Sequence, residues 1–422
     1  MSHSAGGAHA AEVFRTYSFV EKNRLMFETL SMAPPDAILG LGEAFKNDSN
    51  PRKVNLSVGV YKDAKGNTPV LRCVKKAERK LLEQETNKSY LSIEGAAAYG
   101  AAVRELLFGA GHEILTSGRA VTAQTPGGTG GLRVAADFIA RKFPGRRVWF
   151  SKPTWDNHLN IFSTAGLQVE TYPYIDGTGR KLDFDAMLGQ LKQVPEGDVV
   201  LLHACCHNPT GIDPTLDQWR QISEVVHQRH LLPLVDFAYQ GFGGTLDQDA
   251  QGLRVLAQPG KELLICSSFS KNFGLYNERV GALTLVAQDR DAAQVALSHV
   301  RICIRVNYSN PPSHGAAVVS LILGDAELRK EWEVELAEMR DRIASMRQKF
   351  VARMKSKAPQ HDFSFIAQQR GMFSFSGLKP MQVDELRTKH SLYIVVNGGR
   401  INVAGMTEDN LEQICDAIAS VL

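Results

Sequence analysis

Residues 263–286 read LLICSSFSKNFGLYNERVGALTLV, two apolar runs on either side of a polar turn that holds one lysine. The runs Leu263–Ser268 and Ala282–Val286 have the length and near-continuous apolar character of strands covered on both faces. A lysine amine reacts covalently only when it is neutral, which requires desolvation or cationic neighbours. Lys271 has such a neighbour in Arg279 of the same turn. The simpler interpretation is a turn with a solvated lysine.

Short apolar runs alternate with helix-like segments through the middle of the chain. The further strand candidates are Arg147–Ser151, Val169–Tyr174, Val199–Cys205 and Leu232–Phe237, and helical stretches include Leu132–Phe143 and Leu216–Arg229. This alternation predicts an α/β domain with a mainly parallel sheet flanked by helices. Ligands of such a sheet bind beyond the carboxyl ends of its strands.

A long amphipathic segment follows Gly324. Its apolar residues recur every three or four positions, which predicts one helix of roughly 40 Å that runs from one domain into the next. The stripe consists of Leu328, Trp332, Leu336, Met339, Ile343, Met346, Phe350 and Met354. Beyond it, Phe363–Phe375 and Leu392–Asn397 are predicted to be strands of a smaller α+β domain.

Composition limits the classes of function. The chain has 422 residues and a net charge of +3, so neither nucleic acid nor a membrane surface is expected as its main partner. No apolar run approaches the length of a membrane span. The six cysteines lack CxxC spacing, which predicts reduced, buried thiols. Residues 1–20 contain one arginine and one glutamate, so an N-terminal arm is favoured over a transit peptide.

Residues 125–138, TPGGTGGLRVAADF, form a glycine-rich loop that opens a helix. Backbone N–H groups at a helix N-terminus bind anions, and the helix dipole assists them. Ser268, Ser270 and Arg279 are also suited to a phosphate. The alternative is a tight turn without a ligand.

The segment HACCHNPTGIDPT, residues 203–215, follows a strand and invites a metal interpretation. Cys205 and Cys206 are adjacent and should point opposite ways on a strand, so we predict no metal site. Zinc bound by His203, Cys205 and His207 remains the weaker alternative. Asn208 begins a turn, and its amide can donate to a ligand oxygen.

Asp236 ends the apolar run of LVDFAY, residues 234–239. A buried carboxylate needs a cationic or N–H partner, and a protonated ring nitrogen of a cofactor would supply one. A helix-capping aspartate is the alternative. Lys271, an anion cradle, Asp236, the Tyr239 hydroxyl and the Asn208 amide together suit the aldehyde, phosphate, ring nitrogen and phenolic oxygen of pyridoxal phosphate.

With these residues in these motifs, the chain resembles a known family, the class I aminotransferases of the aspartate and aromatic subgroup. The resemblance runs from about Met32 to Leu422 through the motifs VNLSVGVYKD, YLSIEGAAAYG, GGTGGLR, PTWDNH, HACCHNPTGIDPT, VDFAYQGF, SSFSKNFGLYNERVG, RVNYSNPPSHGA, GMFSFSGL and GGRINVAGM. It implies the fold type I of pyridoxal-phosphate enzymes and a homodimer with shared active sites. The implied division is an arm at 1–31, part of a small domain at 32–69, a large domain at 70–338 and the rest of the small domain at 339–422, with a linking helix at about 326–355.

The resemblance implies a role for each cofactor-site residue. Lys271 would bond the cofactor aldehyde and move the proton at the substrate α-carbon. Asp236, supported by His158, would pair with the ring nitrogen, and Tyr239 with Asn208 would bond the phenolic oxygen. Trp155 would stack on one ring face with Ala238 against the other. The phosphate ligands would be Gly128, Thr129, Ser268, Ser270 and Arg279, with Tyr90 from a second subunit.

Two arginines would recognise the substrate. The resemblance assigns the α-carboxylate to Arg400, with Asn208, Trp155 and the Gly59 backbone nearby. Arg305 would reach the distal carboxylate from the neighbouring subunit. Without the resemblance, the sequence around Arg305 predicts only an arginine in a surface salt bridge.

One position departs from the family pattern. Gly127 stands where members commonly carry serine, and Pro126 precedes it. The change removes one hydroxyl donor to the phosphate and leaves the backbone N–H groups.

The sequence therefore predicts an aspartate aminotransferase that transfers the amino group between L-aspartate and 2-oxoglutarate, giving oxaloacetate and L-glutamate. The alternative is a broad-specificity aminotransferase that also uses tyrosine, phenylalanine and tryptophan. A binding protein that kept the fold and lost the chemistry is disfavoured, because no catalytic position is missing. A cytoplasmic location is expected, with mitochondria as the alternative.

Overall fold

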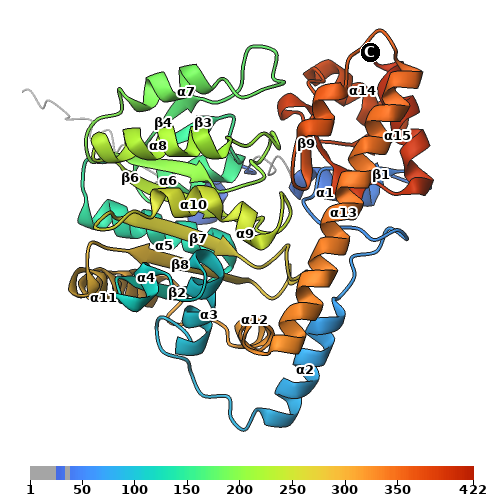
Figure 1. Ribbon diagram of the computed structural model, residues 1–422. Coiled ribbons are helices and arrows are strands. Elements are labelled where there is room, and N and C mark those ends of the chain that lie inside the picture. Colours follow the sequence, from blue (N-terminus) through green and yellow to red (C-terminus); the bar gives the residue numbers. More distant parts are fainter. Residues whose placement is uncertain (1–24, 34–38) are drawn as a thin grey trace, which may run out of the picture. The chain divides into compact units, whose positions relative to one another are not determined.

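The computed structural model describes residues 25–33 and 39–422 (Figure 1). The chain divides into two compact units, Met1–Asp36 and Ala37–Leu422. In the first unit, Met26–Thr29 form the short 3₁₀ helix η1, whose residues are exposed.

The predicted N-terminal arm, residues 1–31, falls mostly outside the described residues. The interpretation of residues 1–20 falls wholly outside them.

A seven-stranded sheet in the order β2-β8-β7-β6-β5-β3-β4 forms the centre of the second unit. Its strands are β2 (Ala120–Pro126), β3 (Arg147–Lys152), β4 (Gln168–Pro173), β5 (Val199–His203), β6 (Leu232–Phe237), β7 (Leu263–Ser268) and β8 (Val280–Val286). Only β8 runs against the others, so the predicted mainly parallel α/β sheet is confirmed. Every strand candidate of this domain is present, and β2 was not predicted.

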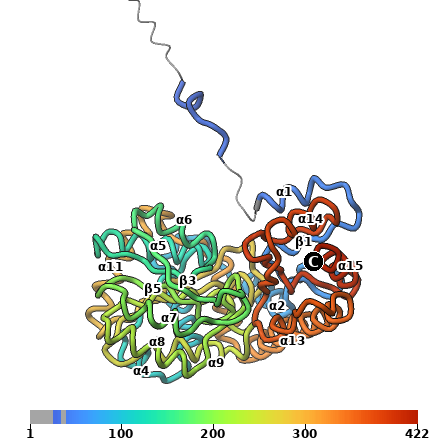
Figure 2. The backbone as a smooth tube through the Cα atoms, turned by 90° about the horizontal axis from the view of Figure 1, so that it is seen from above, coloured from blue at the N-terminus to red at the C-terminus, as the bar shows by residue number. Residues whose placement is uncertain are grey.

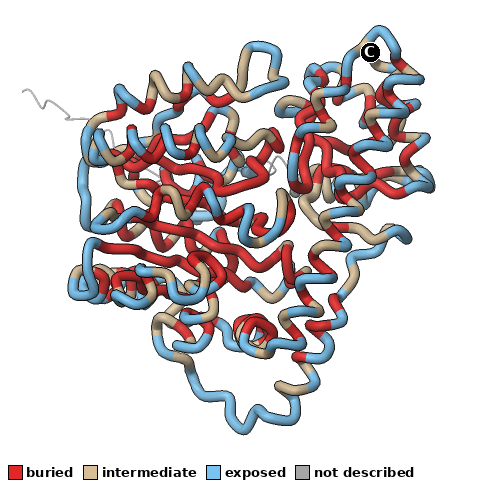
Figure 3. The backbone as a smooth tube through the Cα atoms, in the orientation of Figure 1, coloured by how far each residue is buried: buried red, intermediate tan, exposed pale blue. Residues whose placement is uncertain are grey.

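Helices cover both faces of this sheet, and Figure 3 shows the buried strands between partly exposed helices. The helices are α2 (Arg72–Gln84), α3 (Ala97–Phe108), α4 (Glu113–Thr116), α5 (Gly127–Lys142), α6 (Asp156–Thr164), α7 (Phe184–Leu191), α8 (Leu216–Gln228), α9 (Leu246–Asp249), α10 (Gln251–Leu256), α11 (Arg290–Asn307) and α12 (His314–Gly324). Successive strand residues belong to different cores: Leu234 packs in one hydrophobic cluster and Val235 in the other. The strands are therefore apolar on both faces, as their sequences predicted.

The edge strand β4 corrects one expectation. Its predicted burial on both faces is wrong, because Gln168, Glu170 and Thr171 are exposed and Tyr172 is the residue that is buried. Within the part of the chain that the structure describes, the strand pairs with β3 alone. Polar residues on an exposed edge discourage pairing with another chain.

The predicted long helix is α13 (Ala326–Lys357), and every residue of its apolar stripe is buried. It packs against α2 and α12 near its beginning and against α15 farther along (Figure 1). One continuous helix thus belongs to the sheet region and to the C-terminal region.

The C-terminal region contains α14 (Pro380–His390), α15 (Glu408–Ser420) and two small sheets, and it lies beside α1 (Leu39–Asn47) and β1 in Figure 2. In one sheet β1 (Val54–Asn55) pairs with β10 (Leu392–Tyr393) in parallel. In the other, β9 (Phe373–Phe375) pairs with β11 (Arg400–Asn402) in antiparallel fashion. The short 3₁₀ helices are η2 (Ser364–Gln368), η3 (Asn397–Gly399) and η4 (Val403–Gly405).

The strands predicted in this region are too long. Residues 364–368 form η2 instead, because this turn buries Ile366 against α13 rather than alternating its side chains. The strand predicted at 392–397 ends at Tyr393, and the chain turns into η3.

Two composition-based expectations can be compared with the structure. All six cysteines are free and buried, as predicted for reduced thiols. Among the described residues, no helix combines the length and apolarity that crossing a bilayer requires.

The N-terminus of α2 is capped by a residue of α13. The N-cap residue Leu71 offers no side-chain acceptor. Glu335, which is 5% exposed, accepts hydrogen bonds from the backbone N–H groups of Arg72 at 2.7 Å and Cys73 at 3.0 Å. A carboxylate at this position satisfies two otherwise unpaired donors and interacts favourably with the helix dipole.

We predict that Glu335→Ala lowers the free energy of unfolding by about 1–3 kcal/mol, because two buried N–H groups lose their acceptor. Urea unfolding measures the change. The control is Glu338→Ala on the same helix, whose side chain is 61% exposed, and it should alter stability by less than about 0.5 kcal/mol. Equal effects of both variants would contradict the capping role.

Candidate active site

A cavity of about 230 Å³ lies at the carboxyl ends of β6 and β7. This is the edge at which an α/β sheet is expected to bind its ligand. The cavity is lined by Gly59, Gly128, Thr129, Leu132, Trp155, Asn208, Asp236, Ala238, Tyr239, Ser268, Ser270, Lys271, Tyr276, Arg279, Phe373 and Arg400. The structure thus brings together every predicted site residue except Tyr90 and Arg305.

Lys271 lies in the turn that follows β7, with its amine 4.8 Å from the centre of the Tyr239 ring. Burial lowers the pKa of this amine to about 8, with Arg279 and Arg400 adding to the effect and the Asp236 carboxylate opposing it. The residue is partly exposed because it faces the cavity. An appreciable fraction of the amine is therefore neutral near neutral pH, as covalent chemistry requires.

Asp236 is the penultimate residue of β6 and accepts a hydrogen bond at Oδ2 from Nε2 of the buried His158, at 2.9 Å. Burial by itself would raise the pKa of Asp236, but this hydrogen bond and the electrostatic interactions with His158 and Lys271 outweigh it, so the pKa is lowered. The other nitrogen of His158 bonds Thr154 Oγ1 at 2.8 Å. The carboxylate is thus ionised and held in one orientation, ready to bond a cationic ligand atom.

The histidine network continues away from the cavity. Thr154 Oγ1 also bonds Nε2 of His203 at 3.2 Å. Burial, with the neighbouring His158, lowers the pKa of His203 to about 3, so the ring is neutral. A hydrogen-bonded chain of neutral groups therefore supports His158 from behind.

Arg400 of β11 forms the opposite side of the cavity. It is 3% exposed, and its guanidinium donates to Asn208 Oδ1 at 3.2 Å and to the Ser57 carbonyl at 2.6 Å. Its Nε has no hydrogen-bond partner among the described residues. The guanidinium carbon also lies 4.2 Å from the centre of the Phe373 ring. A buried cation with an unused donor is a binding site for a carboxylate.

Asn208 links Arg400 to Tyr239. Its Nδ2 lies 3.5 Å from the Tyr239 hydroxyl oxygen, at the limit of a hydrogen bond. The two polar groups therefore face the same part of the cavity, where both can donate to one ligand oxygen.

The predicted anion cradle lies where α5 begins. Gly128 and Thr129 are in the first turn of this helix, so their N–H groups are free to bind a ligand. Arg279 Nη1 lies 3.4 Å from Ser270 Oγ, and Ser270 Oγ lies 3.3 Å from Ser268 Oγ. Backbone N–H groups, two hydroxyls and a guanidinium converge, as a phosphate requires. Helix α5 begins earlier than the predicted Leu132.

The unusual Gly127 lies directly against Arg279. Gly127 has φ +75°, and a Cβ at this position would lie 2.4 Å from Nη2 of Arg279. Arg279 itself adopts φ 54°. The glycine is therefore needed for the observed approach of the guanidinium to the start of α5, because a serine would require Arg279 to move.

Two predicted residues lie outside the cavity. Tyr90 is 93% exposed. Arg305 is an exposed residue in the last turn of α11, and it donates a hydrogen bond to Ser309 Oγ. Neither side chain thus lines the cavity formed by its own chain.

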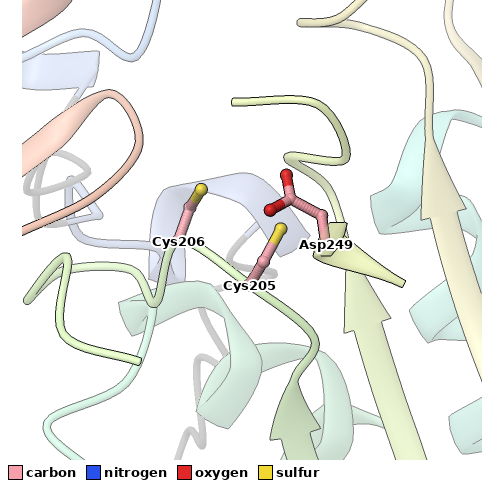
Figure 4. A group of neighbouring side chains, drawn as sticks. All are labelled: Cys205, Cys206 and Asp249. Atoms are coloured by element: carbon pink, nitrogen blue, oxygen red, sulfur yellow. The ribbon is translucent and has the colours of Figure 1, made fainter. Parts of the chain in front are cut away.

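The expected geometry of the cysteine pair is wrong. Strand β5 ends at His203, and Cys206 adopts φ 52°, so the two thiols do not alternate across a strand. Both sulfurs lie near the carboxyl group of Asp249 (Figure 4). His203 and His207 instead bond hydroxyl groups of Thr154, Ser151 and Thr210, so the zinc alternative on His203, Cys205 and His207 is not assembled.

Three cavity residues were not predicted: Leu132, Tyr276 and Phe373. Tyr276 and Phe373 occur within the motifs FGLYNER and GMFSF, so their sequence neighbourhood was recognised. The contact of Phe373 with Arg400 depends on the pairing of β9 with β11, which the sequence pattern alone does not specify.

Comparisons with known proteins agree with this arrangement. Residues 51–418 match the family model described as aminotransferase class I and II. The chain is 55% identical to an aspartate aminotransferase of Escherichia coli over 94% of this chain and 100% of the relative. It is 50% identical to an aromatic-amino-acid aminotransferase of Pseudomonas aeruginosa over 94% of this chain and 98% of the relative. The crystal structure of an aromatic-amino-acid aminotransferase from Burkholderia pseudomallei, covalently bound to pyridoxal phosphate, matches with TM-score 0.91 and 47% identity, covering 94% of this chain and 100% of that chain.

We predict that Lys271 in ligand-free protein titrates with a midpoint near pH 8. Its acetylation by acetic anhydride should rise roughly tenfold per pH unit below the midpoint and then level off, because the neutral amine is the nucleophile. Peptide mass spectrometry quantifies the labelling against an added lysine peptide, whose pKa is about 10.4.

The variant Asp236→Asn separates the contribution of the Asp236 carboxylate to the Lys271 pKa from that of burial. Because the Asp236 carboxylate raises the pKa of Lys271, its removal should move the midpoint to lower pH. A midpoint for Lys271 that coincides with that of the reference peptide would contradict the desolvated amine.

Proposed function

The chain belongs to the class I and II aminotransferases, and from this we propose that it is a pyridoxal-phosphate-dependent aspartate aminotransferase. It transfers the amino group of L-aspartate to 2-oxoglutarate in two half-reactions, giving oxaloacetate and L-glutamate. The single observation that carries the proposal is the joint presence, in one cavity, of a Lys271 amine of lowered pKa and a buried Arg400 with an unused Nε–H donor.

The donor set fits the cofactor. Bound pyridoxal phosphate supplies an aldehyde carbon for the amine and a protonated ring that withdraws electrons from the substrate α-carbon. Asp236 would hold the ring nitrogen, and Asn208 with Tyr239 the phenolic oxygen. Trp155 and Ala238 would enclose the ring. The phosphate would be held by Gly128, Thr129, Ser268, Ser270 and Arg279.

The chain's own groups can perform the proton transfer. The Lys271 Nζ, when neutral, would accept the proton from the substrate α-carbon and later give it back, acting as a positioned general base and acid. A group whose pKa is about 8 exchanges protons efficiently near neutral pH. Asp236 stays ionised throughout because His158 and the nearby positive charges lower its pKa.

Arg400 would bind the α-carboxylate of every amino acid substrate. Its unused Nε–H and an adjacent Nη–H form the fork that a carboxylate accepts. The Asn208 amide and the Gly59 backbone lie at the same end of the cavity. This contact places the α-carbon near Lys271 and does not depend on the nature of the side chain.

Arg305 and Tyr90 would act in trans. We propose a homodimer in which Arg305 of one subunit binds the distal carboxylate of the substrate in the other, and Tyr90 bonds the phosphate there. The exposure of both side chains supports this assignment, since neither serves the cavity of its own chain. We also propose the division into a large domain at 70–338 and a small domain at 32–69 and 339–422, and a cytoplasmic location.

An aromatic or broad-specificity aminotransferase is the second candidate. The observation that favours it is the 50% and 47% identity to proteins named aromatic-amino-acid aminotransferases. Both candidates share the Lys271 chemistry and the Arg400 contact. They differ in the substrate side chain that the cavity accepts, a carboxylate in the first candidate and also an aromatic ring in the second.

We predict that pyridoxal phosphate followed by borohydride labels Lys271 covalently. The neutral amine bonds the aldehyde, and reduction makes the bond permanent. Peptide mass spectrometry identifies the site, and visible absorbance reports binding before reduction. Lys271→Ala should lose the label at this peptide. A label distributed over surface lysines alone, without visible absorbance, would favour a protein that has lost the chemistry.

We predict that Arg305→Leu lowers kcat/KM for aspartate by roughly 30- to 1,000-fold, because a carboxylate loses its charged partner. The value for tyrosine or phenylalanine should change by less than about threefold. Both half-reactions are measured with aspartate, 2-oxoglutarate and the aromatic substrates.

The matched control is Arg290→Leu, an exposed arginine in the first turn of the same helix. It should leave both rates unchanged. Equal losses for aspartate and for aromatic substrates in Arg305→Leu would reject the assignment of Arg305, and faster turnover of aromatic substrates by the unmodified enzyme would favour the second candidate.

A further inference from the structure

Two thiols and a carboxyl group converge outside the Lys271 cavity. Donor atoms of Cys205, Cys206 and Asp249 lie within 4.8 Å of one another, and all three residues are buried. Figure 4 shows the three side-chain ends meeting in one place. The cysteines follow β5, and Asp249 ends α9. None of the three lines the Lys271 cavity, so the proposed aminotransferase chemistry does not use them.

The carboxyl group of Asp249 is held in a fixed orientation. Its Oδ2 accepts hydrogen bonds from the backbone N–H groups of Gly241 at 2.8 Å and Gly243 at 3.0 Å. These bonds occupy one carboxylate oxygen, and the Cys205 thiol also hydrogen-bonds the carboxyl group, a contact that a metal ion between the two would replace.

Gly243 leaves a space between the donors. A Cβ on Gly243 would lie 2.8 Å from Oδ1 of Asp249 and 3.2 Å from Sγ of Cys206. One point in space is therefore close to both atoms, and only the absence of a side chain keeps it free.

The donor set and its spacing suit a thiophilic metal ion. Zinc binds thiolate sulfur at about 2.3 Å and carboxylate oxygen at about 2.0–2.2 Å, so donors around one ion lie roughly 3.5–3.8 Å apart. The observed limit of 4.8 Å requires a contraction of about 1 Å. Cys205 and Asp249 also line a cavity of about 760 Å³, from which a water molecule can complete a tetrahedral site.

One buried cation near the three donors can balance the charge of an anionic metal cluster. Arg347 of α13 is buried, and its guanidinium donates to the carbonyls of Gly371 and Phe373 and to the Ser374 hydroxyl, all uncharged acceptors. A buried cation gains from a nearby negative charge. Two thiolates and one carboxylate around a divalent ion carry one net negative charge, which this guanidinium would balance.

We propose that Cys205, Cys206 and Asp249 form a binding site for a thiophilic divalent cation, Zn²⁺ or Cd²⁺. The proposal is independent of the proposed function, because it concerns a separate group of residues. Metal binding converts both thiols to thiolates and releases their two protons to solvent.

The pKa values of the donors give the site a steep pH dependence. Burial raises the pKa of Cys206 to about 11 and that of Cys205 well above its usual range, and it raises the pKa of Asp249 to about 6. The negative charge of Asp213 opposes thiolate formation at both cysteines, and Arg347 favours it at Cys206. Both thiols are therefore protonated at neutral pH and must lose their protons to the incoming ion.

The test titrates Cd²⁺ into the holoenzyme and measures ultraviolet thiolate-to-cadmium absorption together with the metal retained per chain after buffer exchange. We expect one bound ion per chain, at least about tenfold weaker binding in Cys205→Ser and Asp249→Asn, and unchanged binding in Cys415→Ser, a buried thiol of α15. Asp249→Asn keeps an oxygen for the Gly241 and Gly243 N–H groups, so it separates metal binding from loop stability.

The affinity should also rise roughly 100-fold per unit between about pH 6.5 and 8, because two protons are released. No bound cadmium, or equal binding by Cys205→Ser, Asp249→Asn and the unmodified protein, would overturn the proposal. A tenfold rise per pH unit, which indicates one thiolate, would equally overturn the two-thiol site.

Discussion

The candidate active site depends on one electrostatic constraint: a carboxylate that remains ionised next to an amine that becomes neutral. The topology creates this proximity, because Asp236 lies near the carboxyl end of β6, Lys271 follows β7, and the two strands are parallel neighbours. Each charge would stabilise the other, which would leave the amine protonated. Burial of Lys271 and the positive charges of Arg279 and Arg400 oppose that outcome, while His158 stabilises Asp236 separately. The site therefore needs its surplus of positive charge to keep one lysine reactive.

The same arginine that tunes Lys271 explains the unusual glycine loop. The resemblance led us to expect a serine at Gly127, whose hydroxyl would be one more phosphate donor. In this chain the Arg279 guanidinium occupies the neighbourhood that a Cβ at Gly127 would enter. The packing behind it is equally tight, since a Cβ on Gly281 of β8 would lie 2.4 Å from the carbonyl carbon of Gly127. The loop thus lacks one hydroxyl donor, and the Arg279 guanidinium lies where a side chain at Gly127 would begin.

The sequence predicted the features that depend on residue type and strand order, such as the residues of the cavity. Its predictions were wrong where tertiary contacts set the direction of the backbone. Asp236 and Lys271 could be placed because parallel strands bring their carboxyl ends to one edge. The direction of the Cys205 and Cys206 thiols could not, because the chain leaves the strand at His203 and Asp213 binds the N–H groups of Cys206 and His207. Alternation also mispredicted a strand at 364–368, where packing against α13 favours a turn.

The two arginines proposed to bind the substrate differ in how firmly this chain holds them, and the difference bears on substrate range. Arg400 is buried, bonded to Asn208 and Ser57, and stacked on Phe373, so its position is set before a substrate arrives. A preorganised fork suits the α-carboxylate, which all amino acid substrates share. Arg305 is exposed and, among residues 25–33 and 39–422, its side chain bonds only the Ser309 hydroxyl, so little is lost when it changes rotamer. In the proposed dimer, a fixed arginine would define the reaction geometry and an adaptable one the side-chain preference. This division explains physically how relatives named for aspartate and for aromatic substrates can share one site architecture.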